Sequence, residues 1–138
     1  QIAYLAKKYK AAMPSREIGI HAHNNQQLAF ANTIEAIIQG INYLDGTIFG
    51  IGRAAGNCPL ELLLGFLKNP KFNIRPILHV LEKDFVKLRK EIEWGYTIPY
   101  MITGILDLHP RAGMKLRNSE DKDEYLGFYE KLTSEGNV

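Results

Sequence analysis

The sequence predicts an α/β protein in which a helix–strand–helix–strand–helix segment is followed by a helical region. Apolar residues recur at helical spacing in residues 2–13, 26–39 and 59–68. Two segments between them, 16–22 and 41–48, have the composition of short β-strands. Because strands that are joined through helices run parallel, this alternation indicates an α/β architecture.

The boundaries of these elements follow known helix signals. The first helix should end before Pro14, since a residue that precedes proline is disfavoured in the helical conformation. Gly40 suits the position after the second helix, and Pro59 suits the first turn of the third. We therefore assign residues 1–70 to the α/β part of the chain.

The second half of the chain, residues 71–138, shows no strand pattern. Residues 76–92 and 119–133 are predicted helices, and residues 96–108 form an apolar stretch that Pro99 and Gly104 interrupt. We interpret this half as a helical C-terminal extension.

Two strands are too few for a stable parallel sheet, which is normally covered on both faces. In addition, helical periodicity starts directly at Gln1 without an N-capping residue. We therefore expect the remaining strands to lie in a preceding part of a longer protein or in another copy of the chain.

The composition excludes several classes of protein. The 138 residues carry 17 Lys and Arg against 15 Asp and Glu, so the chain lacks the clustered positive charge of a nucleic-acid-binding protein. No apolar run reaches the roughly 18 residues of a transmembrane helix. The single cysteine, Cys58, excludes an intrachain disulfide framework and makes a cytoplasmic location the default expectation.

His21 and His23 are the strongest candidates for metal ligands. They lie two residues apart at the C-terminal end of the first predicted strand, so their side chains should point to the same face. That end of the strands carries the active site in α/β barrels and open sheets. A structural, hydrogen-bonded pair is the more common explanation for an isolated His-x-His and remains open at this point.

A glycine-rich loop follows the second predicted strand and contains Gly50, Gly52, Gly56 and Asn57. Its spacing differs from the dinucleotide fingerprint, and no Gly-Lys-Ser/Thr of a P-loop is present. Asn57 is either a metal ligand or a cap for the following helix. Asp45, at the exit of the same strand, is expected to hold a ligand histidine or to anchor the loop.

Three further residues have reactive side chains. Tyr96 and Tyr100 are candidates for proton transfer, although a packed aromatic residue is the more common role for either tyrosine. Cys58 is expected to be a small buried residue rather than a nucleophile.

Together these motifs resemble a known family. The strings Ile20-His-Ala-His-Asn-Asn25, Leu44-Asp-Gly-Thr47 and Gly50-Ile-Gly-Arg-Ala-Ala-Gly-Asn-Cys-Pro-Leu-Glu61 occur in the order found in the HMG-CoA-lyase-like, metal-dependent TIM barrels. The resemblance covers about residues 2–68 and is greatest to the 4-hydroxy-2-oxovalerate aldolases. It implies that the chain is the C-terminal part of a (β/α)8 barrel followed by the helical extension.

The resemblance also implies roles for individual residues. His21, His23 and Asn57 match metal ligands of the family, and Tyr96 matches a tyrosine near the substrate in the aldolase branch. The family's metal-binding aspartate and first-strand motif would lie before Gln1. The catalytic cysteine loop of the lyases is replaced by Arg53-Ala-Ala55, which favours an aldolase or a synthase.

The chemistry implied is cleavage or formation of a carbon–carbon bond in a 2-oxo acid through an enolate stabilised by Mn²⁺ or Mg²⁺. A dehydrogenase partner and a homo-oligomer are further expectations, and this portion alone is expected to be inactive. Two alternatives remain: an acyl-CoA-dependent synthase of the isopropylmalate or homocitrate type, and a non-catalytic assembly or anion-binding α/β module.

Overall fold

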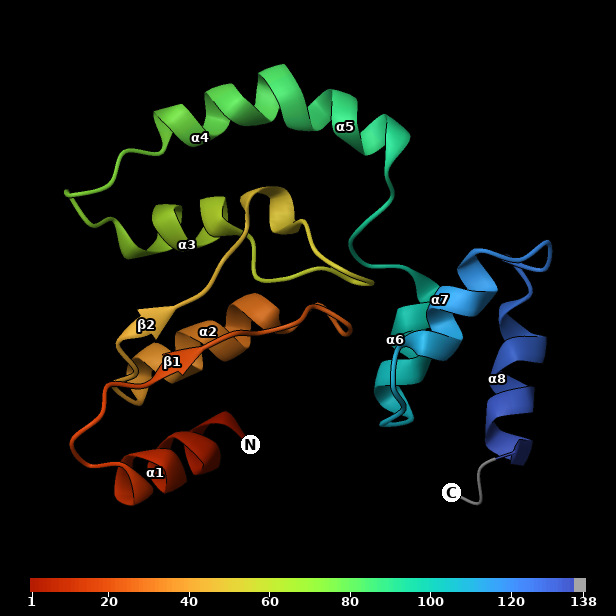
Figure 1. Ribbon diagram of the computed structural model, residues 1–138, viewed down its shortest axis with the longest axis horizontal. Coiled ribbons are helices and arrows are strands. Elements are labelled where there is room, and N and C mark those ends of the chain that lie inside the picture. The colour runs from red at the N-terminus through yellow and green to blue at the C-terminus, as the bar shows by residue number, and fades with distance from the viewer. Residues whose placement is uncertain (136–138) are drawn as a thin grey trace.

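The computed structural model describes residues 1–135 and places a small parallel sheet between helices (Figure 1). Strands β1 (Gly19–Ile20) and β2 (Tyr43–Leu44) pair in parallel, with Gly19 opposite Tyr43 and Ile20 opposite Leu44. Helices α1 (Ile2–Ala12) and α2 (Ala29–Ile38) pack against each other beside this sheet, and α3 (Leu60–Leu67) follows the glycine loop. The predicted helix–strand–helix–strand–helix order is confirmed.

The strands are shorter than the sequence predicts. The patterns at 16–22 and 41–48 yield only two ladder residues each, because within residues 1–135 each strand has one partner strand and its other edge is unpaired. The backbone nevertheless continues in parallel register beyond the ladder, since the amide of Asp45 donates to the carbonyl of Ile20 at 2.9 Å. The described residues therefore contain a fragment of a parallel sheet and not a closed barrel.

Small side chains predominate in two buried cores, both of which pack against Ile20 of β1. One core contains Ala22, Ala29, Cys58 and Leu63, and the other contains Ala6, Ala36 and Ile41. Alanine at these positions lets the helices approach the strands closely. The predicted burial of Cys58 is confirmed, since it is 0 % exposed.

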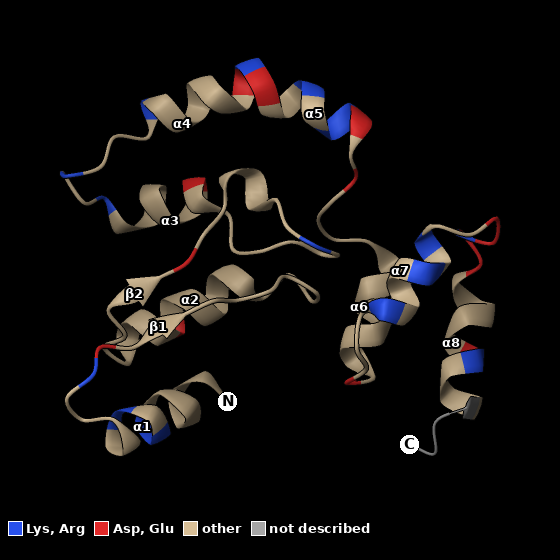
Figure 2. Ribbon diagram, viewed as in Figure 1, with Lys and Arg blue, Asp and Glu red and all other residues tan. Residues whose placement is uncertain are grey.

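The prediction of one helix over residues 76–92 is confirmed with an internal irregularity. Helix α4 (Arg75–Val80) continues through a π-helical turn, η2 (Leu81–Phe85), into α5 (Val86–Glu91). This long segment is drawn above α3 in the view of Figure 1, and its η2 turn contacts residues 48–50. None of its residues is fully buried. Figure 2 shows positive and negative charges alternating toward the end of α5, whereas β1 and most of α2 carry few charges.

Three helices form a separate group after the long segment (Figure 1). The apolar stretch at 96–108 folds as α6 (Ile98–Ile105), which packs mainly on α7 (Arg111–Arg117). The approach is close, because a Cβ at Gly113 would come 3.0 Å from the carbonyl oxygen of Pro99. The sequence pattern did not predict α7.

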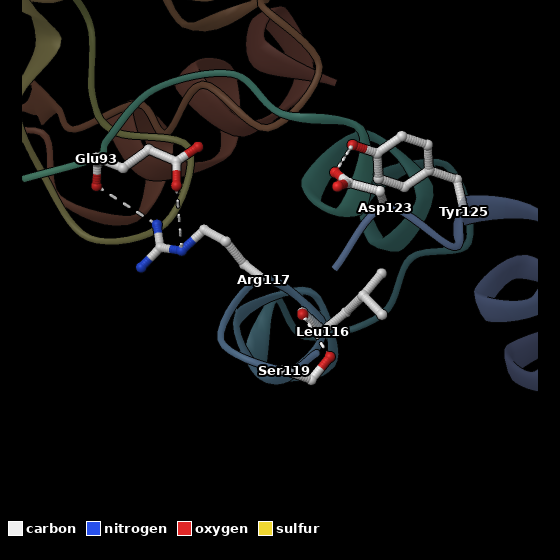
Figure 3. A network of polar contacts seen from close by, with 6 residues as sticks. All are labelled: Glu93, Leu116, Arg117, Ser119, Asp123 and Tyr125. Carbon is white, nitrogen blue, oxygen red and sulfur yellow. Dashed lines mark hydrogen bonds and ion pairs between the residues drawn. The ribbon is translucent and has the colours of Figure 1, made fainter. Parts of the chain in front are cut away.

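The last helix, α8 (Tyr125–Glu135), begins six residues later than predicted. Residues 119–123 form turns instead, in which the amide of Glu124 donates to the carbonyl of Asp121 and the hydroxyl of Ser119 donates to the carbonyl of Leu116 (Figure 3). These local hydrogen bonds compete with the helix that the spacing of apolar residues favours. None of the helices within residues 1–135 has the length and apolar character needed to cross a membrane.

Candidate metal and substrate site

The two candidate histidines lie just beyond the carboxyl end of β1. Their ring centroids are 5.0 Å apart and the rings are nearly perpendicular, at 83°. The strand predicted over residues 16–22 ends at Ile20 in the structure, so His21 does not belong to it. The chain leaves the ladder after Ile20, and His23 instead forms an isolated antiparallel bridge with Asn57.

Asp45 contacts the first of these histidines. Its Oδ2 lies 3.1 Å from Nδ1 of His21, and both side chains are at least half exposed. A carboxylate at Nδ1 favours the tautomer that carries the imidazole proton on Nδ1. The lone pair of Nε2 is then available to bind a metal ion. This is one of the two roles that the sequence suggested for Asp45.

Asn57 is placed beside His23 by its backbone and fixed by its side chain. Its Nδ2 donates to the carbonyl of Ile51 at 3.2 Å, whereas its Oδ1 is buried without a hydrogen-bond partner among the described residues. The helix-capping alternative is wrong: α3 has Pro59 at its N-cap position, and no side chain caps it. A buried amide oxygen without a partner is unfavourable unless something else satisfies it.

The glycines of the loop shape the backbone around Asn57. Gly50 and Gly56 have φ angles of +61° and +76°, which glycine adopts without strain. A Cβ at Gly52 would lie 2.6 Å from Nδ2 of Asn57, so a larger residue there would displace that side chain from its present position. The loop then returns to the histidine segment, since the amide of Asn24 donates to the carbonyl of Gly56 at 3.0 Å.

The two tyrosines of the extension have different surroundings. Tyr96 is 39 % exposed, and its hydroxyl has no hydrogen-bond partner in the described part of the chain. Tyr100 is 0 % exposed in a core with Ala54 and Ala55, so it is the packed aromatic residue that the sequence favoured. Burial raises the pKa of Tyr100, and the nearby Arg117 opposes that rise.

Arg117 of α7 anchors the segment that carries Tyr96. Nη1 of Arg117 donates to the carbonyl of Glu93 at 3.4 Å, and its Nε lies 4.0 Å from the Glu93 carboxylate (Figure 3). The same guanidinium lies 5.7 Å from the centre of the Tyr100 ring. The residues before Tyr96 are therefore fixed to the helical group.

The donors present fit part of a divalent metal site. Two imidazoles and one unsatisfied amide oxygen are ordinary ligands for ions such as Mn²⁺, which accepts both nitrogen and oxygen. However, within residues 1–135 no three His, Cys, Asp or Glu side chains are grouped closely enough to hold a metal ion. A complete site would need at least one more ligand from elsewhere.

Sequence reasoning missed three residues that surround the start of the glycine loop: Phe49, Arg89 and Trp94. The guanidinium of Arg89 lies over both aromatic rings, and Nε1 of Trp94 donates to the carbonyl of Phe49 at 2.9 Å. The only available signal was that Trp94 directly precedes Gly95-Tyr96. Spacing alone could not show that residues so far apart in the chain meet.

Comparison with known proteins identifies relatives of this chain. The model of the HMGL-like family matches residues 1–87. The chain is 39 % identical over 80 residues to a 4-hydroxy-2-oxovalerate aldolase of Thermus thermophilus. This alignment covers 55 % of the chain and 23 % of that protein. It is 44 % identical over 66 residues to an oxaloacetate decarboxylase of Mycobacterium tuberculosis, covering 46 % of the chain and 20 % of that protein.

Among solved structures, the N-terminal domain of a candidate aldolase from Bacteroides vulgatus is similar. It matches with a TM-score of 0.68 and 32 % identity over 85 % of this chain and 41 % of that one. The chain thus spans about a fifth of the length of the curated relatives it matches. The match of the family model to more than half of the residues shows that the chain belongs to the HMGL-like family.

Proposed function

We propose that the full-length protein is a divalent-metal-dependent lyase that makes or breaks a carbon–carbon bond in a 2-oxo acid. The observation that carries this proposal is that the rings of His21 and His23 lie side by side just beyond the carboxyl end of β1. A backbone bridge joins His23 to Asn57, whose Oδ1 is buried without a partner among the described residues. The names of the relatives, an aldolase and a decarboxylase of oxo acids, support the same chemistry.

Each residue of the group would have a distinct role. His21 and His23 would donate ring nitrogens to Mn²⁺ or Mg²⁺, and the amide oxygen of Asn57 would complete this side of the site. Asp45 would hold His21 by its Nδ1. A bound divalent cation supplies Lewis acidity toward the carboxylate and keto oxygens of a 2-oxo acid. A carboxylate from another part of the full-length protein would be the remaining ligand.

Two further roles concern the substrate rather than the metal. Gly50, Gly52 and Gly56 would keep the loop backbone open beside the bound oxo acid. Tyr96, which is 39 % exposed and whose hydroxyl is unpaired among residues 1–135, would exchange a proton with the substrate oxygen at the bond that is formed or broken. Residues 71–138, which contain Tyr96, would in this way contribute to the site as a helical extension.

The proposal is tested by His21→Ala and His23→Ala in the full-length protein. Bound manganese is measured by elemental analysis after dialysis, and turnover by pyruvate release from a 4-hydroxy-2-oxo acid and from oxaloacetate. Both variants should lose bound metal and activity, with rates lowered by more than about 100-fold, as expected for loss of a metal that polarises the substrate.

His79→Ala is the matched control, because His79 is an exposed histidine on α4 away from this group. It should retain metal and activity. Full metal content and full activity in His21→Ala and His23→Ala would refute the proposal. Activity only with an acyl-CoA as second substrate would replace the aldolase with the synthase alternative.

A further inference from the structure

A cation and three aromatic rings meet where the glycine loop begins. The guanidinium carbon of Arg89 lies 4.8 Å from the ring centre of Phe49 and 5.2 Å from that of Trp94. The two rings contact each other edge to face at 5.8 Å, and Phe85 approaches Trp94 in the same way at 6.3 Å. We call these four residues, Phe49, Phe85, Arg89 and Trp94, the Arg89 clamp.

The clamp holds Phe49 in a conformation that it would not adopt by itself. Phe49 has φ 56° and ψ 22°, a left-handed geometry that is unfavourable for a residue with a bulky side chain. Three contacts oppose this cost: the Arg89 guanidinium on the ring, the Trp94 Nε1 hydrogen bond to the carbonyl, and the Glu61 carboxylate, which accepts from the amide at 3.0 Å. Trp94 is only 2 % exposed, so its hydrogen bond is sheltered from water.

Phe49 is linked to the candidate metal ligand Asn57 through one intervening residue, Gly50. The next residue, Gly50, accepts a hydrogen bond from the amide of Asn57 at 3.0 Å. Asn57 in turn pairs with His23 through the backbone. A change in the φ of Phe49 would rotate the Gly50 carbonyl away from the amide of Asn57.

The other side of the clamp is connected to the candidate tyrosine. Trp94 precedes Gly95, whose Cα lies 3.8 Å from the position that a Cβ would take at Gly56. Gly95 has φ +99°, and it directly precedes Tyr96. The clamp therefore joins the glycine loop to the segment that carries Tyr96.

We infer that Arg89 is a positioning residue. Its guanidinium packs over both Phe49 and Trp94 and thereby fixes the glycine loop, and with it Asn57, against the helical extension. Among the described residues Arg89 has no acidic partner, so its contacts with the two rings are the interactions that place it. The importance of the position of Asn57 rests on the proposed function, whereas the ordering of the loop does not.

The test uses hydrogen–deuterium exchange of the full-length protein with Arg89→Met, which keeps an unbranched side chain but removes the cation. Cation–π contacts at exposed sites stabilise by about 0.5–1 kcal/mol, so loop amides between residues 50 and 58 should exchange about two- to fivefold faster. Amides of α2 should keep their rates. The dissociation constant for Mn²⁺ should rise by a similar factor, and Arg89→Lys should restore part of both effects.

Lys90→Met is the matched control, since Lys90 is an exposed cation next to Arg89 in α5. It should change neither exchange nor affinity. The inference is overturned if Arg89→Met leaves loop exchange unchanged, if exchange accelerates equally throughout the chain, or if faster loop exchange leaves Mn²⁺ affinity unaltered. A wild-type protein that binds no Mn²⁺ would instead refute the proposed function, and loop exchange would still decide whether Arg89 orders the loop.

Discussion

Replacing Gly56 with alanine tests whether the glycine loop has the geometry described. Gly56 has φ +76°, and a Cβ built on it overlaps the carbonyl oxygen of Gly50. That same oxygen accepts the hydrogen bond from the amide of Asn57. The substitution should therefore disturb the loop at the hydrogen bond that fixes the backbone of the candidate ligand.

The expected cost has three parts. The left-handed conformation costs alanine about 1–2 kcal/mol. Moving the Gly50 carbonyl away from the new methyl group costs about another 1 kcal/mol through the weakened hydrogen bond. Forced backbone shifts in a packed site add about 1–3 kcal/mol. Gly56→Ala should thus lower the free energy of unfolding by about 3–6 kcal/mol if the three costs add fully.

Gly65→Ala is the matched control. Gly65 lies in α3, and apart from its chain neighbours and the nearby backbone of that helix no atom lies within 4 Å of a Cβ built there. Alanine in the interior of a helix is favoured over glycine by about 0.5–1 kcal/mol, so this variant should be slightly more stable than the wild type. Urea unfolding followed by circular dichroism measures both variants. A loss below about 1 kcal/mol for Gly56→Ala would refute the steric argument, since the strain of the positive φ alone should exceed it.

Three further predictions concern the core and the extension. Leu63 is 2 % exposed beside Cys58, so Leu63→Ala should lower the free energy of unfolding by about 2–5 kcal/mol, as measured by urea unfolding. Trp94→Phe keeps a ring but loses the hydrogen bond to Phe49, so unfolding should show a loss of about 1–3 kcal/mol because that carbonyl is left unpaired. Burial raises the pKa of Tyr100 above 10.0, so the unfolded chain ionises first and stability should fall as the pH rises beyond 10.0. Tyr100→Phe should reduce that alkaline loss in a pH series of thermal melts, and an unchanged slope would contradict the assignment.

The helices of the α/β part were predictable because apolar residues recur in them at helical spacing. Their buried faces were less predictable, since Leu5 and Tyr9 of α1 are 46 % and 52 % exposed while the small Ala6 is buried. Ala36 of α2 lies in the core that the 3.6-residue period indicates. The strands were predicted too long. Their residue composition indicates a tendency to form β-structure, but it does not show how many neighbouring strands are present to pair with. The α7 helix was not predicted, since its seven residues are too few to show a clear period.

The candidate site was predictable to a similar extent. The sequence brought His21, Asp45 and Asn57 to one end of the sheet, because the carboxyl ends of parallel strands lie together. It could not show that Asp45 lies at Nδ1 of His21, or that Asn57 bonds to Ile51, since both depend on side-chain rotamers. The contribution of Arg89 was not predictable, because the residue lies 40 positions from Phe49 in the sequence.

Backbone hydrogen bonds join the two segments of the candidate site, the histidine segment and the glycine loop, so these segments should move together. The amide of Cys58 donates to the carbonyl of Ala22 at 3.1 Å, and the amide of Asn24 donates to the carbonyl of Gly56 at 3.0 Å. These two hydrogen bonds surround the His23–Asn57 bridge, so the histidine segment and the glycine loop form one antiparallel pair outside the parallel sheet. The distance between His23 and Asn57 is therefore fixed by main-chain geometry, and the sheet itself has to supply only the start of the histidine segment.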